Sequence, residues 1–130
     1  MSLRFDSGCL TGVLGENGSG KSTLFRIVAG VTRPSRGTVR IGGEDPGVRT
    51  RAITAFLPEI DLYYRWMRVE EQLAYLSAFY AGWDEGKQME LLEVMKLDRQ
   101  AKIGELSQGQ RARLKIVAAF SWPSRLVVLD

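Results

Sequence analysis

Short apolar runs of strand length occur at three places along the chain. They cover residues 9–14 (CLTGVL), 52–57 (AITAFL) and 126–129 (LVVL). Runs of this kind are typical of parallel strands that are buried on both faces of a sheet. A fourth segment, residues 37–45, alternates apolar and polar residues between glycines, and this pattern predicts a small β hairpin with a tight turn.

Apolar residues recur every three or four positions in four other segments, and this spacing predicts helices with one apolar face. The segments are residues 22–29, 69–83, 85–97 and 110–120. The two middle helices are joined by a glycine-containing turn over residues 82–86. We expect the apolar stripes of both to be packing surfaces in the core.

The order of these elements predicts an α/β fold, in which helices cover both faces of a mostly parallel sheet. We expect residues 1–60 and 107–130 to form the core of the domain. The helices over residues 61–106 are expected to form an inserted helical subdomain, with boundaries good to a few residues.

Composition narrows the class of protein further. The chain has 130 residues, of which 45% are hydrophobic and 25% charged, as in an ordinary globular domain. No apolar run approaches the roughly 20 residues that cross a bilayer, and the N-terminus lacks the apolar stretch of a signal peptide. The net charge of +3 comes from basic residues spread along the sequence, so no nucleic acid is expected as a partner.

Two residue counts exclude whole classes of chemistry. Cys9 is the only cysteine, so no disulfide forms within the chain, and beside an apolar run we expect this residue to be a small buried side chain. The chain contains no histidine, which excludes a histidine metal ligand, triad or general base within it.

The first candidate site is a glycine-rich loop, GENGSGKS, that matches the pattern G-x-x-x-x-G-K-[ST] from Gly15 to Ser22. Glycines let the backbone turn its N–H groups toward phosphate oxygens. Lys21 is placed to reach the β and γ phosphates, and the hydroxyl of Ser22 to bind Mg²⁺. The helix that follows points the positive end of its dipole at the same phosphates. A chance glycine-rich turn is the alternative, but the predicted strand before it and helix after it favour nucleotide binding.

The second and third candidates lie in the last quarter of the chain. LVVLD ends in Asp130, and an aspartate at the carboxyl end of a parallel strand near a phosphate loop can complete a Mg²⁺ site. A helix cap or turn is the alternative for Asp130. In LSQGQ, Ser107 and Gln110 have the spacing of a capping box, and a capped helix start with Gly109 in its first turn also offers N–H groups to an anion. The basic residues just behind this motif are expected to form a solvated face, and a contribution to the positive field at the phosphates is the alternative: Arg111, Arg113 and Lys115.

Together these motifs resemble those of the ATP-binding-cassette (ABC) ATPases over essentially the whole chain. GENGSGKST is similar to the Walker A motif, LVVLD to Walker B, and LSQGQ to the signature LSGGQ, with Gln108 in place of a glycine. The resemblance implies a P-loop NTPase fold, ATP and Mg²⁺ as cofactors, and ATP hydrolysis. It also implies a head-to-tail dimer of cassettes, expected to be a homodimer, that binds ATP between the Walker A of one cassette and the signature of the other.

The resemblance implies a role for each site residue. Lys21, Glu59 and Asp130 are the implied catalytic residues, and the implied Mg²⁺ ligands are Ser22, Glu59 and Asp130. Glu59 stands where the family has a glutamine, so it offers a carboxylate but no amide donor. The residues implied to contact nucleotide are Gly15, Asn17, Gly18, Ser19, Gly20, Lys21, Ser22, Thr23, Ser107 and Gly109.

The string LPEIDLYYRWMRVEEQL over residues 57–73, with SAFYAGWD after it, most resembles the ATP-binding subunits of ABC-2-type exporters. The resemblance implies a separate membrane permease as partner, and a cytoplasmic location at the inner face of the cell membrane. Tyr63, Tyr64 and Trp66 are candidates for the permease contact, and burial within the helical insert is the alternative for these three.

The family's catalytic glutamate, switch histidine and adenine-stacking aromatic have no counterpart here, so we expect a cassette truncated at both ends. Three hypotheses remain open. The first is an exporter motor, the second a soluble cassette protein outside transport, and the third a remnant that binds nucleotide without hydrolysing it. ATPase activity that is lost in Lys21→Ala would exclude the third.

Overall fold

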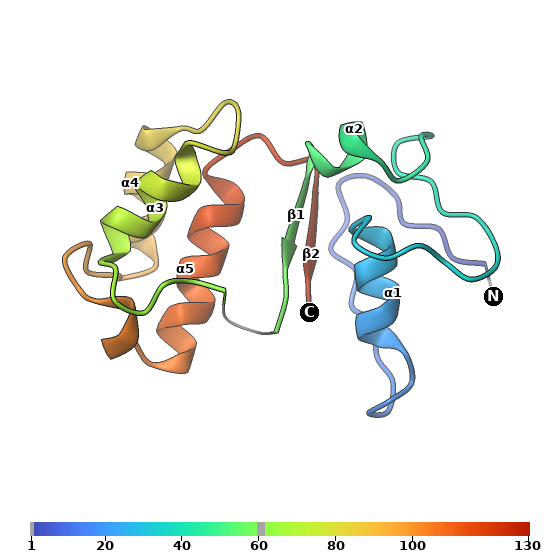
Figure 1. The fold of residues 1–130 in the computed structure, drawn as a ribbon, viewed down its shortest axis with the longest axis horizontal. Coiled ribbons are helices and arrows are strands. Elements are labelled where there is room, and N and C mark those ends of the chain that lie inside the picture. Colours follow the sequence, from blue (N-terminus) through green and yellow to red (C-terminus); the bar gives the residue numbers. More distant parts are fainter. Residues whose placement is uncertain (1, 60–61) are drawn as a thin grey trace.

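The computed structural model describes residues 2–59 and 62–130. Figure 1 shows the order of elements along the chain. In that order they are α1 (Lys21–Val28), α2 (Val48–Arg51), β1 (Thr54–Leu57), α3 (Val69–Ser77), α4 (Glu85–Val94), the short 3-10 helix η1 (Ile103–Glu105), α5 (Gln108–Phe120) and β2 (Leu126–Leu129).

Two parallel strands form the centre of the described structure. β1 and β2 pair in a continuous register, from Thr54 opposite Leu126 to Leu57 opposite Leu129. In Figure 1, α5 lies on one side of this pair and α1 on the other, so helices cover both faces. The strand predicted at residues 126–129 is therefore confirmed, and the strand predicted at residues 52–57 is present but begins two residues later, at Thr54. The α/β class is confirmed.

The main core lies among α3, α4 and α5. Leu73, Ile103 and Leu114 are fully buried there, and Trp83 packs against the edge of the cluster. The apolar stripes predicted for the middle helices are therefore core surfaces for the most part. Tyr80 and Met89 are exceptions, because they are 39% and 42% exposed.

Three helices begin or end at residues other than those predicted. α3 ends at Ser77 rather than near residue 83, and Gly82, with a φ of 76°, lies in the turn that follows. α4 ends at Val94, three residues earlier than predicted. α5 begins at Gln108, two residues earlier than predicted, because Ser107 caps its first turn.

The predictions for the first 50 residues are wrong in three respects. Residues 9–14 form no strand, and Leu10 and Leu14 are 99% and 97% exposed. Cys9, expected to be buried, is exposed. The predicted hairpin is reduced to one antiparallel bridge between Ile41 and Glu44. A strand needs a neighbour for its backbone hydrogen bonds, and among the described residues the sheet contains only β1 and β2.

Two further expectations concern the limits of the molecule. The predicted boundary between core and helical insert falls at residues 60 and 61, which lie outside the described residues. In the part of the chain that the structure describes, every helix is too short or too polar to cross a membrane.

Candidate nucleotide-binding site

The glycine-rich loop leads directly into α1. Gly18 and Gly20 have φ angles of 81° and 94°, a left-handed conformation that side chains with a Cβ rarely adopt. Gly20 is the N-cap of α1, and its carbonyl accepts from the amide of Leu24 at 2.9 Å. The first N–H groups of α1 therefore open toward the loop, as an anion-binding helix start requires.

Lys21 folds back over this loop. Its Nζ donates hydrogen bonds to the carbonyl oxygens of Gly15 and Glu16, both at 2.7 Å. A Cβ at Gly15 would come within 2.8 Å of the Ser19 Oγ, so a larger residue here would require the Ser19 side chain to turn away. The loop thus holds an ammonium group against its own backbone, close to the helix start.

Ser22 and Asp130 meet although they are far apart in the sequence. Ser22 Oγ donates a hydrogen bond to Asp130 Oδ1 at 2.8 Å. The amide of Asp130 donates to the carbonyl of Leu57, so this residue extends the β1–β2 ladder instead of capping a helix. The phosphate loop and the carboxyl end of β2 are brought together, as the Walker A and Walker B resemblance implies.

The chemistry of this pair fits a magnesium ion. Mg²⁺ prefers hard oxygen ligands and takes only one or two from the protein when phosphates and water supply the rest. The Ser22 hydroxyl and the Asp130 carboxylate are oxygens of that kind. Among the described residues no group of three or more histidine, cysteine, aspartate or glutamate side chains gathers around one point, so a site built from protein ligands alone is not present there.

Glu59 lines the same pocket as Asp130. This pocket, which we call the Asp130 pocket, has a volume of 410 Å³ and lies between the carboxyl ends of both strands and the first turns of α5. Glu59 is exposed, directly after Pro58. Its carboxylate and that of Asp130 therefore share one open space. The other side chains that line it include Gln108, Arg111, Lys115 and Ile116.

The LSQGQ motif forms the start of α5. The Ser107 Oγ accepts from the amide of Gln110 at 3.2 Å, and the Gln110 Oε1 accepts from the amide of Ser107 at 2.8 Å. The predicted capping box is therefore confirmed. Gly109 is exposed, and a Cβ added to it would meet open space. Crowding within the chain therefore does not require a glycine at position 109. A glycine would be required if another molecule approached this backbone closely.

The three basic residues behind this motif do not form the predicted solvated face. Each is half-buried and donates to a backbone carbonyl of another segment: Arg111 to Leu106, Arg113 to Met95, and Lys115 to Pro58. The sequence contained a signal for Lys115, which is a single charge within the apolar run from Leu114 to Phe120. A buried charge needs hydrogen-bond partners, so a lone lysine in an apolar run indicates acceptors within the fold rather than a solvated face.

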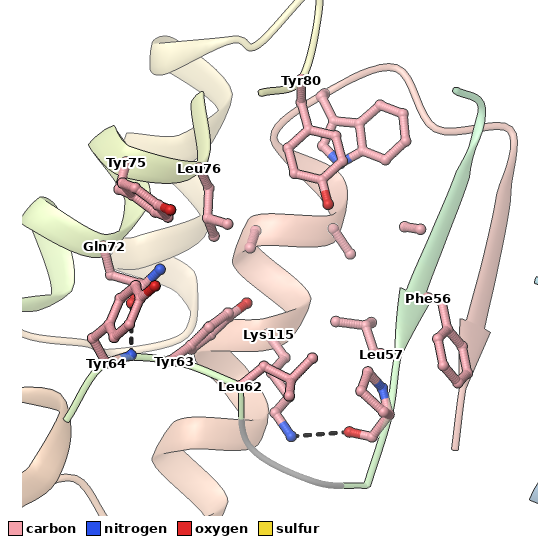
Figure 2. Close-up of a pocket in the computed structure, with 15 residues that line it drawn as sticks. Phe56, Leu57, Leu62, Tyr63, Tyr64, Gln72, Tyr75, Leu76, Tyr80 and Lys115 are labelled. Carbon is pink, nitrogen blue, oxygen red and sulfur yellow. Dashed lines mark hydrogen bonds between the residues drawn. The ribbon is translucent and has the colours of Figure 1, made fainter. Parts of the chain in front are cut away.

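A second pocket lies between β1, α3 and α5 (Figure 2). We call it the aromatic pocket; it has a volume of 220 Å³, and tyrosines 63, 64, 75 and 80 lie on its walls with Trp122. At its floor Gln72 is almost fully buried, and its Oε1 accepts from the amide of Tyr64 at 3.0 Å. Tyr80 stacks on Trp122 with ring centroids 4.7 Å apart.

The candidates for a permease contact divide between burial and exposure. Tyr63 is half-buried and packs against the main core, whereas Tyr64 is 44% and Trp66 69% exposed. Tyr64 lies beside Trp66 and Tyr75, with ring centroids 5.9 and 5.8 Å apart. A hydrogen bond with Tyr64, together with Coulombic repulsion, raises the pKa of the Tyr75 hydroxyl.

Comparisons with known proteins agree with this geometry. The chain is 33% identical over its whole length to the Nod factor export ATP-binding protein I of Rhizobium sp. (strain N33), and covers 45% of that protein. It is 34% identical over its whole length to the sulfate/thiosulfate import ATP-binding protein CysA of Bradyrhizobium diazoefficiens, and covers 41% of it. The chain thus spans less than half the length of these curated relatives.

A solved structure and a family description extend the comparison. The structure of a putative ABC transporter ATP-binding protein from Pyrococcus furiosus superposes with a TM-score of 0.79 at 30% identity, covering 89% of this chain and 58% of that one. The family described as ABC transporter matches residues 1–130. The chain therefore belongs to the ABC transporter family.

Proposed function

We propose that this chain is the ATP-binding part of an ABC transporter, which binds ATP with Mg²⁺ and hydrolyses it to ADP and phosphate. One observation carries the proposal. The Lys21 ammonium, the start of α1 and the Ser22–Asp130 pair lie together at one end of the sheet. A cation, free N–H groups and two hard oxygens are what a nucleotide triphosphate with its metal ion requires.

In this proposal each group has one task. Backbone N–H groups of residues 17–20 and Thr23 hold the phosphate oxygens, and Lys21 contacts the β and γ phosphates. Ser22 and Asp130 hold Mg²⁺, with Glu59 facing the same pocket as a further ligand or as a partner for the attacking water. Mg²⁺, when bound, would offset the charge of the phosphates.

We further propose that two copies of the chain pair head to tail. The support is the open start of α5, where the hydrogen bonds of Ser107 go to its own helix and Gly109 faces open space. In the pair, Ser107 and Gly109 of one copy would contact the γ phosphate that the other copy holds.

The finer proposal is an exporter motor that works on a separate ABC-2-type permease. It rests on the resemblance of residues 57–73 and on the exposed rings of Tyr64 and Trp66 beside the aromatic pocket. Both an export and an import protein are among the relatives by name. The genes next to this one test the direction: an ABC-2-type permease gene supports export, and genes for an importer permease with a binding protein overturn it.

Nucleotide binding is tested by isothermal titration of the chain with ATP and Mg²⁺. Lys21→Ala removes a charged hydrogen-bond donor, and we expect about 10- to 100-fold weaker binding. Lys102→Ala, at an exposed lysine away from the loop, is the matched control and should bind within about twofold of the unchanged chain. Equal affinity in the Lys21→Ala variant, or no binding by the unchanged chain, contradicts the proposal. Phosphate release by the same variants separates hydrolysis from binding alone.

A further inference from the structure

Lys115 stands between the two pockets. It projects from the middle of α5, and it lines the aromatic pocket and the Asp130 pocket alike. Leu57 and Pro58, at the end of β1, are the other residues that line both. Among the described residues, the two pockets therefore meet at Lys115 and at the end of β1.

The ammonium group is joined to that backbone. Lys115 Nζ donates to the carbonyl of Pro58 at 3.1 Å and to the carbonyl of Glu59 at 3.4 Å. Figure 2 shows the bond to Pro58 crossing from α5 to the end of β1. A half-buried cation must keep hydrogen-bond acceptors in place of water. Here the acceptors are the carbonyls of Pro58 and Glu59. The backbone at these two residues determines where the Glu59 side chain starts.

We propose that Lys115 is a positioning residue, which ties the Pro58–Glu59 backbone to α5 and so holds the Glu59 carboxylate over the Asp130 pocket. This inference rests on the proposed function, in which Glu59 faces the metal and the attacking water. Lys115 itself need not touch the nucleotide.

The charges around the Asp130 pocket support this role. Among the described residues its ionisable side chains are Glu59 and Asp130, which follow the strands, and Arg111 and Lys115, which belong to α5, so the formal charges of these four sum to zero. Two carboxylates facing one space repel each other, and the cations from α5 offset that repulsion before a metal arrives. Without the Lys115 charge, two carboxylates would face one arginine in the described lining. Glu59 is more exposed than Asp130, so we expect the Glu59 side chain to move away.

The same connection links the two candidate phosphate sites. α5 carries Ser107 at its cap and Lys115 about two turns further along. A rigid helix moves as one body, so a shift of the Ser107 end would be transmitted through Lys115 to Glu59. Contact of a second copy with the Ser107 end of α5 would then change the position of Glu59 in the Asp130 pocket of the same chain.

Two variants and one matched control test the role. Lys115→Met keeps most of the apolar stem but removes the positive charge and the hydrogen-bond donors. Lys115→Arg keeps both a positive charge and N–H donors. Arg113→Met is the control, because Arg113 is also a half-buried cation of α5 that donates to a backbone carbonyl, that of Met95, outside both pockets. All three are compared with the unchanged chain.

The first measurement is amide hydrogen exchange at Glu59 and at residues 62–63 in the nucleotide-free chain. Loss of the Lys115 anchor should speed exchange there by about two- to tenfold, in line with the net value of one hydrogen bond. The second measurement is the ratio of ATP affinities with and without Mg²⁺, which should fall by a similar factor in Lys115→Met. Lys115→Arg should recover most of both effects, and Arg113→Met should change neither.

Each other outcome overturns part of the inference. Unchanged exchange in Lys115→Met means that the lysine does not anchor the segment. Faster exchange with an unchanged ratio of the ATP affinities measured with and without Mg²⁺ means that Lys115 fixes the backbone but does not position the Glu59 carboxylate for the metal. Equal losses in Arg113→Met mean a general effect on stability. If the unchanged chain binds no ATP, the proposed function fails and the role toward Glu59 fails with it, whereas a failure of Lys115 alone leaves the effect of Lys21→Ala intact.

A double variant sharpens the result. If Lys115 acts through the Glu59 carboxylate, the change of Lys115 to Met should have no further effect on the Mg²⁺ ratio in a chain that already carries Glu59→Gln. Independent roles would instead give effects that multiply.

Discussion

The helical region of the chain and its first 50 residues differ sharply in how they are held together. α3, α4 and α5 share a core in which Leu73, Ile103 and Leu114 are fully buried. Of the described residues up to 51, only Ala29 and Thr50 are buried, and α1 buries no residue of its own. The region with most of the proposed nucleotide contacts is thus the one with the least core.

The difference teaches which elements a chain can stabilise from its own neighbourhood. A helix satisfies its backbone hydrogen bonds internally, so an apolar stripe needs only another helix beside it. A strand depends on a partner strand for those bonds. The glycine-rich loop depends on neither, because glycine conformations and the two hydrogen bonds of Lys21 define it locally.

The largest expected effect separates the two regions by stability. Leu114→Ala should lower the free energy of unfolding by about 2–5 kcal/mol, because it opens a cavity in a closed core. Leu14→Ala is the matched control in the glycine-rich region, where the side chain is 97% exposed, and should change it by less than about 0.5 kcal/mol. Urea unfolding followed by circular dichroism measures both. Equal losses would mean that the first region has a core of its own.

A smaller effect is expected at the boundary of α5. Ser107→Ala removes the side-chain cap of this helix and should lower the free energy of unfolding by about 1 kcal/mol. Ser35→Ala, at an exposed serine among the first 50 residues, should change it by less than about 0.5 kcal/mol. Thermal unfolding of the two variants decides the point, and a silent Ser107→Ala would show that α5 is held by packing alone.

The smallest effect is a pH dependence confined to the helical region. Hydrogen bonds from Gln100 and Arg99 lower the pKa of the Glu70 carboxyl below its ordinary value. A carboxyl with a lowered folded pKa stabilises the fold above its unfolded pKa, and this contribution disappears as the pH falls through the folded pKa. The stability difference between the unchanged chain and Glu70→Gln should therefore shrink as the pH drops below about 4.

The control for this effect is Glu93→Gln, at an exposed carboxyl on α4. Glu93→Gln lies outside the group of hydrogen bonds around Glu70 and should change the free energy of unfolding by less than about 0.5 kcal/mol at pH 7. A Glu70→Gln difference that stays constant between pH 7 and pH 3 would show that the contacts of Glu70 do not depend on its charge.

Sequence patterns predicted the elements that a local rule determines. The periodic segments became α1, α3, α4 and α5, and two of the apolar runs became β1 and β2. The run at residues 9–14, which includes Thr11 and Gly12, also has the length of a strand, but no hydrogen-bonded neighbour accompanies it in the described structure. An apolar run shows that a segment has side chains to bury, but it does not show whether another strand or helix is present to pack against them.

The candidate site was foreseen unevenly. The resemblance implied that Ser22 and Asp130 meet, and they do so at 2.8 Å; their roles toward Mg²⁺ and nucleotide remain predictions. Lys115 was expected on a solvated face, although it is a single charge within an apolar run. Its acceptors are the backbone carbonyls of Pro58 and Glu59. A side chain that binds backbone leaves no matching residue type in the sequence, so these partners could not be predicted from it.

The bonds of Lys21 to its own loop also have an entropic consequence. A free lysine side chain samples many rotamers, and fixing one costs up to about 2 kcal/mol. In this chain both acceptors belong to the backbone of the loop itself, so that ordering belongs to folding and not to binding. An arriving phosphate would meet an ammonium group already in place, with one of its three N–H bonds still available. Calorimetry should then show Lys21 contributing to binding mainly through enthalpy.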